Sequence, residues 1–141
     1  MKTRYSMAVA LVWMAAIAMT ASAHDGQAQA GEVVTRFNQV LPNVPGKSMI
    51  AVEVTLAPGQ VSVPHHHAKS AFIMAYVLSG TIRSQVEGEP ARDYSAGETW
   101  LELPGAHHIQ AENLSKTEPA RLLAVFILDS DDQVLTTLDP L

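Results

Sequence analysis

Short extended segments, each closed by glycine or proline, set the main limit on how this chain can fold. Between Ser48 and Leu56 apolar and polar residues alternate from Ile50 onward, which is typical of a half-buried strand. None of the segments shows a sustained helical period. The others that we expect to be strands are Val33–Leu41, Phe72–Leu78, Thr81–Val86, Arg92–Tyr94, Thr99–Leu103, Ile109–Leu114 and Arg121–Leu128. We therefore predict an all-β domain, built as an antiparallel sandwich or barrel.

The segment from Phe72 to Leu78 differs from the others because it is apolar throughout. A continuous apolar run of this length, rich in strand-forming residues, is typical of a strand that is buried on both faces. Ser79 and Gly80 follow it and predict a tight turn into the next strand. The sequence thus predicts a central strand at this point of the fold.

Histidines gather at two points of the chain. Five of its 6 histidines lie in two clusters, namely His65, His66 and His67, and then His107 and His108. Residues two apart on a strand point the same way, so His65 and His67 would offer their imidazoles to one point while His66 faces the other side. A third nitrogen from His107 or His108 would complete a face that binds a metal ion. The alternative interpretation is a solvated loop at the end of a strand.

Around these histidines the sequence resembles the two motifs of the cupin family. The first motif is matched by Gly59, His65, His67 and Gly80, and the second by Gly97, Pro104-Gly105-Ala106-His107-His108 and Asn113. The resemblance covers residues 33–128 and implies a double-stranded β-helix, which is a jelly-roll barrel of the cupin type. It also implies that His65, His67 and His108 bind a divalent transition metal. Imidazole ligands suit Cu, Zn, Fe, Mn or Ni better than Mg or Ca.

The first cupin motif usually also contributes a glutamate, and this sequence lacks it there. The stretch where that glutamate would fall, Ala71 to Ile73, is wholly apolar. Either the metal has three protein ligands and water, or another side chain takes the fourth place. Four side chains are candidates for it, two that share strand parity with His108 and two that precede the Pro104 turn: Gln110 and Glu112, and Glu98 and Glu102.

Further residues are candidates to line a ligand cavity. Large apolar side chains fit either a cavity wall or the core, and here they are Phe72, Met74, Tyr76 and Trp100. Arg83 and Gln85 share one face of their strand. If that face is interior, Arg83 would pair with a carboxylate on the ligand; if it is exterior, Arg83 is a solvated charge. By strand alternation, His66 and His107 fit the rim of the site better than the metal itself.

The first 23 residues are typical of a secretory signal peptide. Lys2 and Arg4 precede an apolar run that ends in Ala21-Ser22-Ala23, a small-residue cleavage site. We therefore expect a periplasmic or secreted protein with a flexible leader at residues 24–32, the barrel at 33–128 and a C-terminal tail at 129–141. A membrane anchor is the alternative, although a bilayer span needs roughly 20 apolar residues.

The composition and net charge of the chain limit the kinds of partner that it can bind. Removal of Lys2 and Arg4 lowers the basic residues from 9 to 7 against 14 acidic residues, so the net charge moves from -5 to -7. Such a surface disfavours nucleic acid and anionic membranes. There is no cysteine, so no disulfide can form. We expect a small-molecule ligand or substrate and, because cupins are commonly dimers, a homodimer.

Two functions are compatible with these features. One is an exported metal-dependent oxidoreductase of the dioxygenase kind, or an isomerase, acting on a small molecule. The other is a non-catalytic cupin that binds or senses a metal or small molecule, and the missing motif glutamate favours it. A hydrolase is not indicated, because the chain has neither cysteine nor a G-x-S-x-G sequence. The sequence leaves open whether the protein is an enzyme.

Overall fold

The protein is described by a computed structural model over residues 31–140, so the predicted signal peptide and most of the leader lie outside the described residues. Within them the chain forms ten strands and no helix. The strands are β1 (Glu32–Val40), β2 (Lys47–Leu56), β3 (His65–His67), β4 (Phe72–Ser79), β5 (Thr81–Val86), β6 (Arg92–Ser95), β7 (Thr99–Glu102), β8 (His107–Asn113), β9 (Ala120–Asp129) and β10 (Thr136–Leu138). The prediction of an all-β fold is confirmed.

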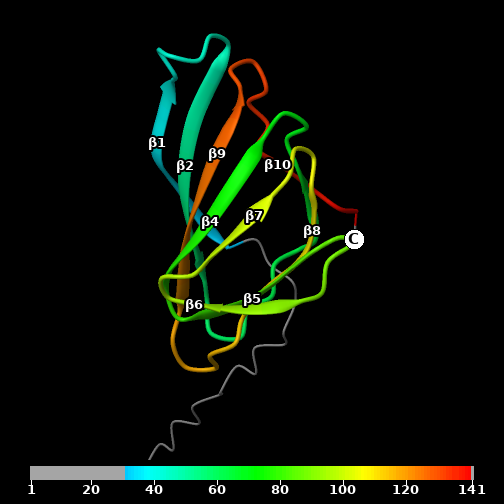
Figure 1. The fold of residues 1–141 in the computed structure, drawn as a ribbon. Coiled ribbons are helices and arrows are strands. Elements are labelled where there is room, and N and C mark those ends of the chain that lie inside the picture. The colour runs from blue at the N-terminus through cyan, green and yellow to red at the C-terminus, as the bar shows by residue number, and fades with distance from the viewer. Residues whose placement is uncertain (1–30, 141) are drawn as a thin grey trace, which may run out of the picture.

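The strands form two antiparallel five-stranded sheets (Figure 1). The first sheet has the order β1-β2-β9-β4-β7, and the second sheet has the order β10-β3-β8-β5-β6. Most connections pass from one sheet to the other, as between β4 and β5 and between β7 and β8. The chain therefore winds around a shared interior in the manner of a jelly roll.

The interior follows from the alternation in the longest strands. On β2, Ile50, Val52 and Leu56 are buried and face inward, as the sequence predicts. On β9, which pairs with β2 along its whole length, Leu122 and Phe126 are buried in the same core. Burying a side chain of this size stabilises the fold by about 1.5–3 kcal/mol. The central strands of the first sheet thus form one wall of the interior.

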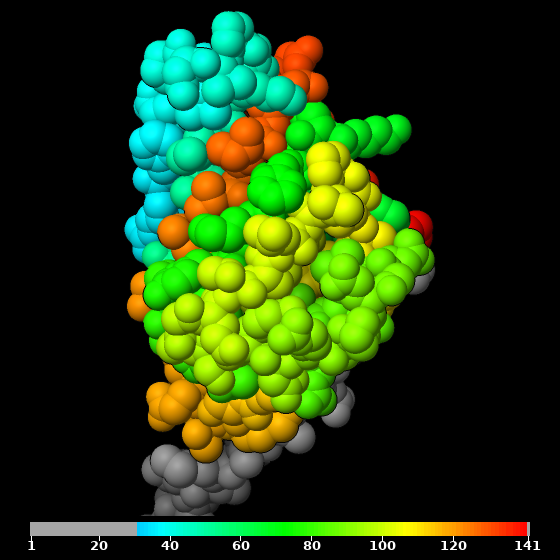
Figure 2. All heavy atoms as spheres, in the orientation of Figure 1, coloured from blue at the N-terminus to red at the C-terminus, as the bar shows by residue number. Residues whose placement is uncertain are grey.

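The prediction that β4 is buried on both faces is wrong for the single chain. Ile73, Ala75 and Val77 are buried, but the side chains between them alternate outward, and Tyr76 is 38% exposed. Figure 2 views the first sheet from this outer side, where β9, β4 and β7 follow one another in orange, green and yellow. The strand is apolar throughout because its outer side chains belong to an exposed apolar face.

A tight turn at Gly80 carries the chain from β4 in the first sheet to β5 in the second. Its φ is 79°, a left-handed conformation that glycine adopts without strain. A Cβ atom here would also lie 2.8 Å from the Cβ atom of Ala120. Glycine is therefore required both by the turn and by the close approach of β9.

The predicted tail at residues 129–141 contains the edge strand β10. It pairs antiparallel with β3, with Thr136 opposite His67 and Leu138 opposite His65. Leu135, just before it, packs against the hydrophobic core. Over residues 31–140 there is no helix of a length and hydropathy that would let it cross a membrane.

Candidate metal centre

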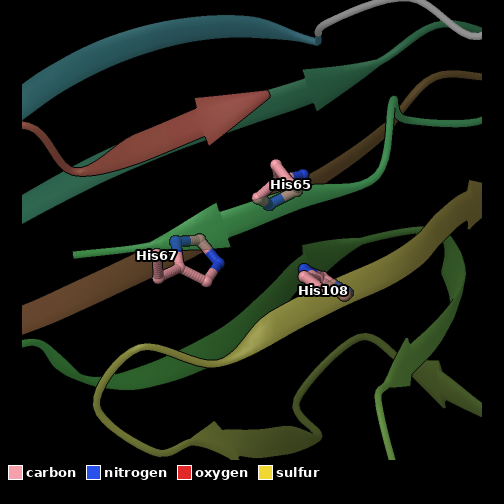
Figure 3. Close-up of side chains that lie close together, drawn as sticks. All are labelled: His65, His67 and His108. Carbon is pink, nitrogen blue, oxygen red and sulfur yellow. The ribbon is translucent and has the colours of Figure 1, made fainter. Parts of the chain in front are cut away.

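The short strand β3 presents its three histidines alternately to the two sides of the second sheet. His65 pairs with His108 of β8, and His66 pairs with His107. Since cross-strand partners point the same way, His65, His67 and His108 share the inner side, as Figure 3 shows. The strand parity that the sequence predicts for β3 is therefore present.

The three inner rings lie close enough to share one ion. One ligand atom from each ring lies within 4.8 Å of the others. The ring centroid of His65 is 4.8 Å from that of His67 and 5.1 Å from that of His108. An ion held at roughly 2.0–2.1 Å by each nitrogen would need only a modest inward movement of these side chains.

Backbone carbonyl oxygens hold two of the rings in orientation. His65 Nδ1 lies 2.8 Å from the carbonyl oxygen of Val63, and His67 Nδ1 lies 3.2 Å from that of Leu135. A carbonyl oxygen only accepts hydrogen bonds, so each Nδ1 carries a proton and donates it. In the neutral ring Nε2 then presents a lone pair to the interior, which is the state in which imidazole binds a metal.

A buried carboxylate, Glu102 of β7, completes this group. Its exposed fraction is 3%, and its Oε2 lies 3.0 Å from His67 Nε2 while its Oε1 lies 3.4 Å from His108 Nδ1. The indole Nε1 of Trp100 donates a hydrogen bond of 2.9 Å to Oε1. On the neighbouring strand β4, the residue opposite Glu102 is Ile73. Glu102 therefore brings a carboxylate to the region where the cupin motif would have its glutamate.

Two atoms at the centre of this group lack partners. His67 Nε2 and Glu102 Oε2 are both buried, and neither has a hydrogen-bond partner among the described residues. They lie 3.0 Å apart, which makes an ion pair only when the His67 ring is protonated. Buried polar atoms are rarely left unpaired, and two facing lone pairs repel each other. A cation coordinated by both would satisfy them, so the residues present fit a divalent transition metal.

Burial and charge set the protonation states of the group. Burial raises the pKa of Glu102, but the contact with His67 and the neighbouring His108 outweigh it, and the pKa is lowered to about 2. Burial lowers the pKa of His108 to about 4 and also lowers the pKa of His65. A charged Glu102 carboxylate beside the unprotonated imidazoles of His65 and His108 is a combination that favours metal binding.

The three inner histidines and Glu102 line a cavity of about 520 Å³ that is partly open to solvent. The remaining wall is largely apolar, with Val52, Trp100 and Phe126 from the first sheet and Ala111 from the second. The tail contributes Leu135, Thr136 and Leu138. Of the residues predicted to line a site, the structure brings Trp100 and Glu102 to this cavity.

Other residues predicted to line the site lie elsewhere. Tyr76 is on the exposed outer side of β4. Arg83 points outward and pairs with Asp93 through hydrogen bonds of 2.7 and 3.0 Å, so the exterior alternative is correct. Outside the cavity wall also lie Gln85, which bonds the Glu89 carbonyl oxygen, and Gln110 and Glu112, which bond each other.

His107 lies on the outward side of the second sheet, away from the inner rings. Its ring stacks on that of His66, and its Nε2 lies 2.8 Å from Asp139 Oδ2. That carboxylate raises the pKa of His107. The sequence prediction included neither Asp139 nor Leu135 in a site, because nothing local marks a tail that docks on a distant strand.

Two facing antiparallel sheets around a histidine-lined cavity define a double-stranded β-helix protein. The sequence profile of the cupin domain matches residues 52–126 of this chain. Because the match spans more than half of the chain, the chain belongs to the cupin family. The resemblance found in the motifs is thereby confirmed.

Solved structures with the same fold include proteins of several kinds. An uncharacterized conserved protein with a double-stranded β-helix domain from Klebsiella pneumoniae has a TM-score of 0.58 and 18% identity, over 82% of this chain and 90% of that one. A recombinant oxalate oxidase in complex with glycolate has a TM-score of 0.54 and 23% identity, over 78% and 59%. The DMSP lyase DddQ from Ruegeria pomeroyi has a TM-score of 0.56 and 19% identity, over 77% and 51%.

The two enzymes are longer than this chain, which spans 59% of the oxidase and 51% of the lyase. Identities of 18–23% show that the fold is shared and show nothing finer. No curated protein matches the chain.

Proposed function

We propose that this cupin holds one divalent transition metal on His65, His67, His108 and Glu102, and that a small molecule binds beside it in the cavity. The observation that carries the proposal is the buried pair His67 Nε2 and Glu102 Oε2, which face each other without hydrogen-bond partners. Three imidazoles and a carboxylate suit Fe, Mn, Ni, Cu or Zn. When bound, such an ion supplies open positions that polarise an oxygen-bearing ligand.

The cavity wall favours a small and largely uncharged molecule. No lysine or arginine is among the described residues that line it, and beyond the four proposed ligands its side chains are apolar apart from Ser62 and Thr136. Apart from the metal itself, a ligand with a free carboxylate would find no cationic partner in this wall to offset its lost hydration. A phenol, a thiol or another compound with one coordinating atom on an apolar body fits better.

We propose an oxidoreductase of the dioxygenase kind, or an isomerase, as the activity of this site. The absence of the motif glutamate favoured a non-catalytic protein, because it left the site without a carboxylate. Glu102 supplies a carboxylate beside His67 and His108, and so it supports an enzyme. An oxalate oxidase and a DMSP lyase among the structural neighbours show that the fold hosts such small-molecule chemistry elsewhere. The second candidate is a non-catalytic binding protein, favoured by the scarcity of further acid–base groups in the wall.

Metal analysis of the full chain, purified without a histidine tag, tests the metal centre. We expect His67→Ala to lose one equivalent of bound metal and Glu102→Gln to bind it at least about tenfold more weakly. Glu98→Gln is the matched control, because Glu98 is an exposed carboxylate that bonds the Ser95 amide. Metal content and affinity that are unchanged in both His67→Ala and Glu102→Gln would refute the proposal.

Turnover separates the two candidate functions. Oxygen uptake with a phenolic or thiol substrate, abolished in His108→Ala, would establish the oxidoreductase. If the metal-loaded protein binds such compounds without converting them, the binding function is correct. An isomerase would convert its substrate without consuming oxygen.

We also propose export to the periplasm or the exterior, on the signal-like sequence of residues 1–23. The intact mass of the protein from the exported fraction should correspond to a chain that begins at His24. Retention of Met1–Ala23 in a membrane-bound protein would contradict it.

We propose finally that the protein is a homodimer in which a second copy covers the outer face of the first sheet. Supporting this, Met74 lies between Val125 and Leu101 in the strand register, which makes a continuous apolar row across β9, β4 and β7. Leu101 is 59% exposed in the single chain. Exposed apolar surface of this extent is typical of an interface between proteins.

A further inference from the structure

The outward side of β3 and β8 carries a second cluster of possible ligands that the inner site does not use. His66 and His107 are paired in register, and their rings stack with a centroid distance of 4.1 Å and an interplanar angle of 14°. Asp139, which follows β10, reaches both rings. Its Oδ2 lies 2.8 Å from His107 Nε2, and its Oδ1 lies 3.8 Å from His66 Nε2.

We propose that His66, His107 and Asp139 form a second, outward-facing site for a divalent transition metal such as Zn²⁺, and that the bound ion holds β10 over the cavity. One ligand atom from each of the three lies within 4.8 Å of the others. Two imidazoles and a carboxylate with water in the fourth position form a common zinc site. Glu87 adds negative charge, because its Oε2 lies 3.7 Å from His107 Nδ1.

Occupancy requires a small rearrangement of the rings. Parallel stacked rings direct their lone pairs side by side, whereas two nitrogens that share one tetrahedral ion converge on it. His66 can make this change at low cost, because its side chain is 53% exposed. Binding therefore tilts the His66 ring away from the His107 ring while Asp139 stays close to both.

The three ligands come from separate segments, so the ion would join them. His66 belongs to β3, His107 to β8 and Asp139 to the chain just after β10. The backbone N–H of Asp139 already donates to the carbonyl oxygen of Pro64 at 3.0 Å. Because β10 is an edge strand that pairs with β3 alone among the described strands, a cross-link at its end restricts the opening of the whole strand.

This restriction matters for the cavity because the same segment forms part of its wall. Thr136 and Leu138 line the cavity from β10, and both are exposed on their other sides. A small molecule that enters or leaves beside the tail must displace them. The outer ion would therefore slow the exchange of molecules between the cavity and solvent. If His107 and Asp139 instead form only a hydrogen bond and bind no metal, zinc would leave the tail unaffected.

Isothermal titration of the full chain with Zn²⁺ alone, without a histidine tag, tests the outer site. His65→Ala combined with Glu102→Gln removes two of the four proposed inner ligands, and His67→Ala combined with Glu102→Gln provides a second inner variant in case the first does not fold. In either background we expect one zinc to remain, and we expect His66→Ala or Asp139→Asn to weaken it about tenfold or more. The inner and outer sites share no ligand, so failure of one is distinguishable from failure of the other.

Hydrogen exchange gives the second readout. In the background of His65→Ala with Glu102→Gln, zinc should slow amide exchange at residues 136–139 at least about fivefold, and His66→Ala should remove the effect. Gln85→Ala, on the same outward side of the second sheet, should leave zinc binding and exchange unchanged. The proposal is overturned if the inner-site variants bind no zinc, or if zinc binds them equally well without His66 and Asp139, or if zinc leaves tail exchange unaltered.

Discussion

Glu102 is the only acidic side chain among the described residues that line the cavity. It pairs across strands with Ile73, so the two side chains start from neighbouring points on the inner side of the first sheet. A carboxylate at either position is within reach of the same imidazoles. Ala71, by contrast, is fully buried outside the cavity wall. The cross-strand pair thus explains how an apolar β4 is compatible with a carboxylate at the centre.

Moving the carboxylate from one strand to the other should preserve metal binding. Glu102→Leu should weaken binding at least about tenfold, because a charged ligand is lost. Adding Ile73→Glu to it should recover most of that affinity, since the new carboxylate starts from the cross-strand position. Competition with a chromophoric chelator measures both effects.

Ala71→Glu in the same Glu102→Leu background is the matched control, and it should not recover binding. A glutamate at this position would also lie in the core without a partner, at a cost of several kcal/mol. Recovery by Ala71→Glu but not by Ile73→Glu would show that β4 is shifted in register.

The sequence predicts the inner histidines better than their partners. The parity of His65 and His67 is a local property of one strand, so it can be read from spacing alone. Glu102 is one of four candidates that spacing cannot rank, because its approach depends on how β7 pairs with β4. Strand parity also does not say which side of a strand faces inward, so the sequence could not decide whether the Arg83 side chain is interior or exterior.

At the scale of the elements, the bounds of a strand are predicted almost to the residue where the sequence alternates clearly or where glycine or proline marks a turn at each end. β5 spans Thr81–Val86 as expected, because glycines close it on both sides. β8 begins at His107 rather than at Ile109, since pairing with β3 extends it. β10 carries no local signal, because three exposed residues form a strand only through their contact with a segment some seventy residues away.

Glu53 connects three neighbouring strands of the first sheet. From β2 it accepts hydrogen bonds from Arg121 of β9 at 2.6 Å and from Arg36 of β1 at 2.9 Å. These two guanidinium groups, Arg121 more strongly, lower the pKa of Glu53. A carboxyl group whose pKa is lowered on folding stabilises the fold above its ordinary pKa of about 4.3, and this contribution is lost as the pH falls through the lowered value.

Glu53→Gln should therefore lower the melting temperature at pH 7, and its difference from the wild type should shrink below about pH 4. Thermal unfolding monitored by circular dichroism from pH 7 to pH 3 measures this. Glu89→Gln, at an exposed turn, should differ little from the wild type at any pH. A constant difference for Glu53→Gln across the range would show that its charge is not the cause.

At the scale of the whole molecule, the first sheet has a buried side and an apolar outer side. A single chain that exposes such a face in water has a strong tendency to associate. Because the face is the outer surface of a sheet, a second copy can meet it face to face about a twofold axis. Pairing of this kind would leave the second sheet, and with it β10, uncovered.

Leu101→Glu should shift the protein from dimer to monomer, because the charge would be buried without a partner in the interface. Light scattering coupled to size-exclusion chromatography, over a range of protein concentrations, measures the mass. Gln85→Glu adds the same charge to the other sheet and should leave the mass unchanged. A wild-type protein that is monomeric at tens of micromolar would contradict the homodimer.

The rings of His65 and His67 are oriented by the carbonyl oxygens of Val63 and Leu135, and so by main chain rather than side chain. Every amino acid supplies that carbonyl, so point substitutions at these two positions leave the orienting bonds in place. The ligand geometry is thereby protected against sequence drift in its immediate surroundings. What would disturb it is an insertion or deletion that reroutes the backbone, and the segment between β9 and β10 is where a change in length would reach His67 most directly.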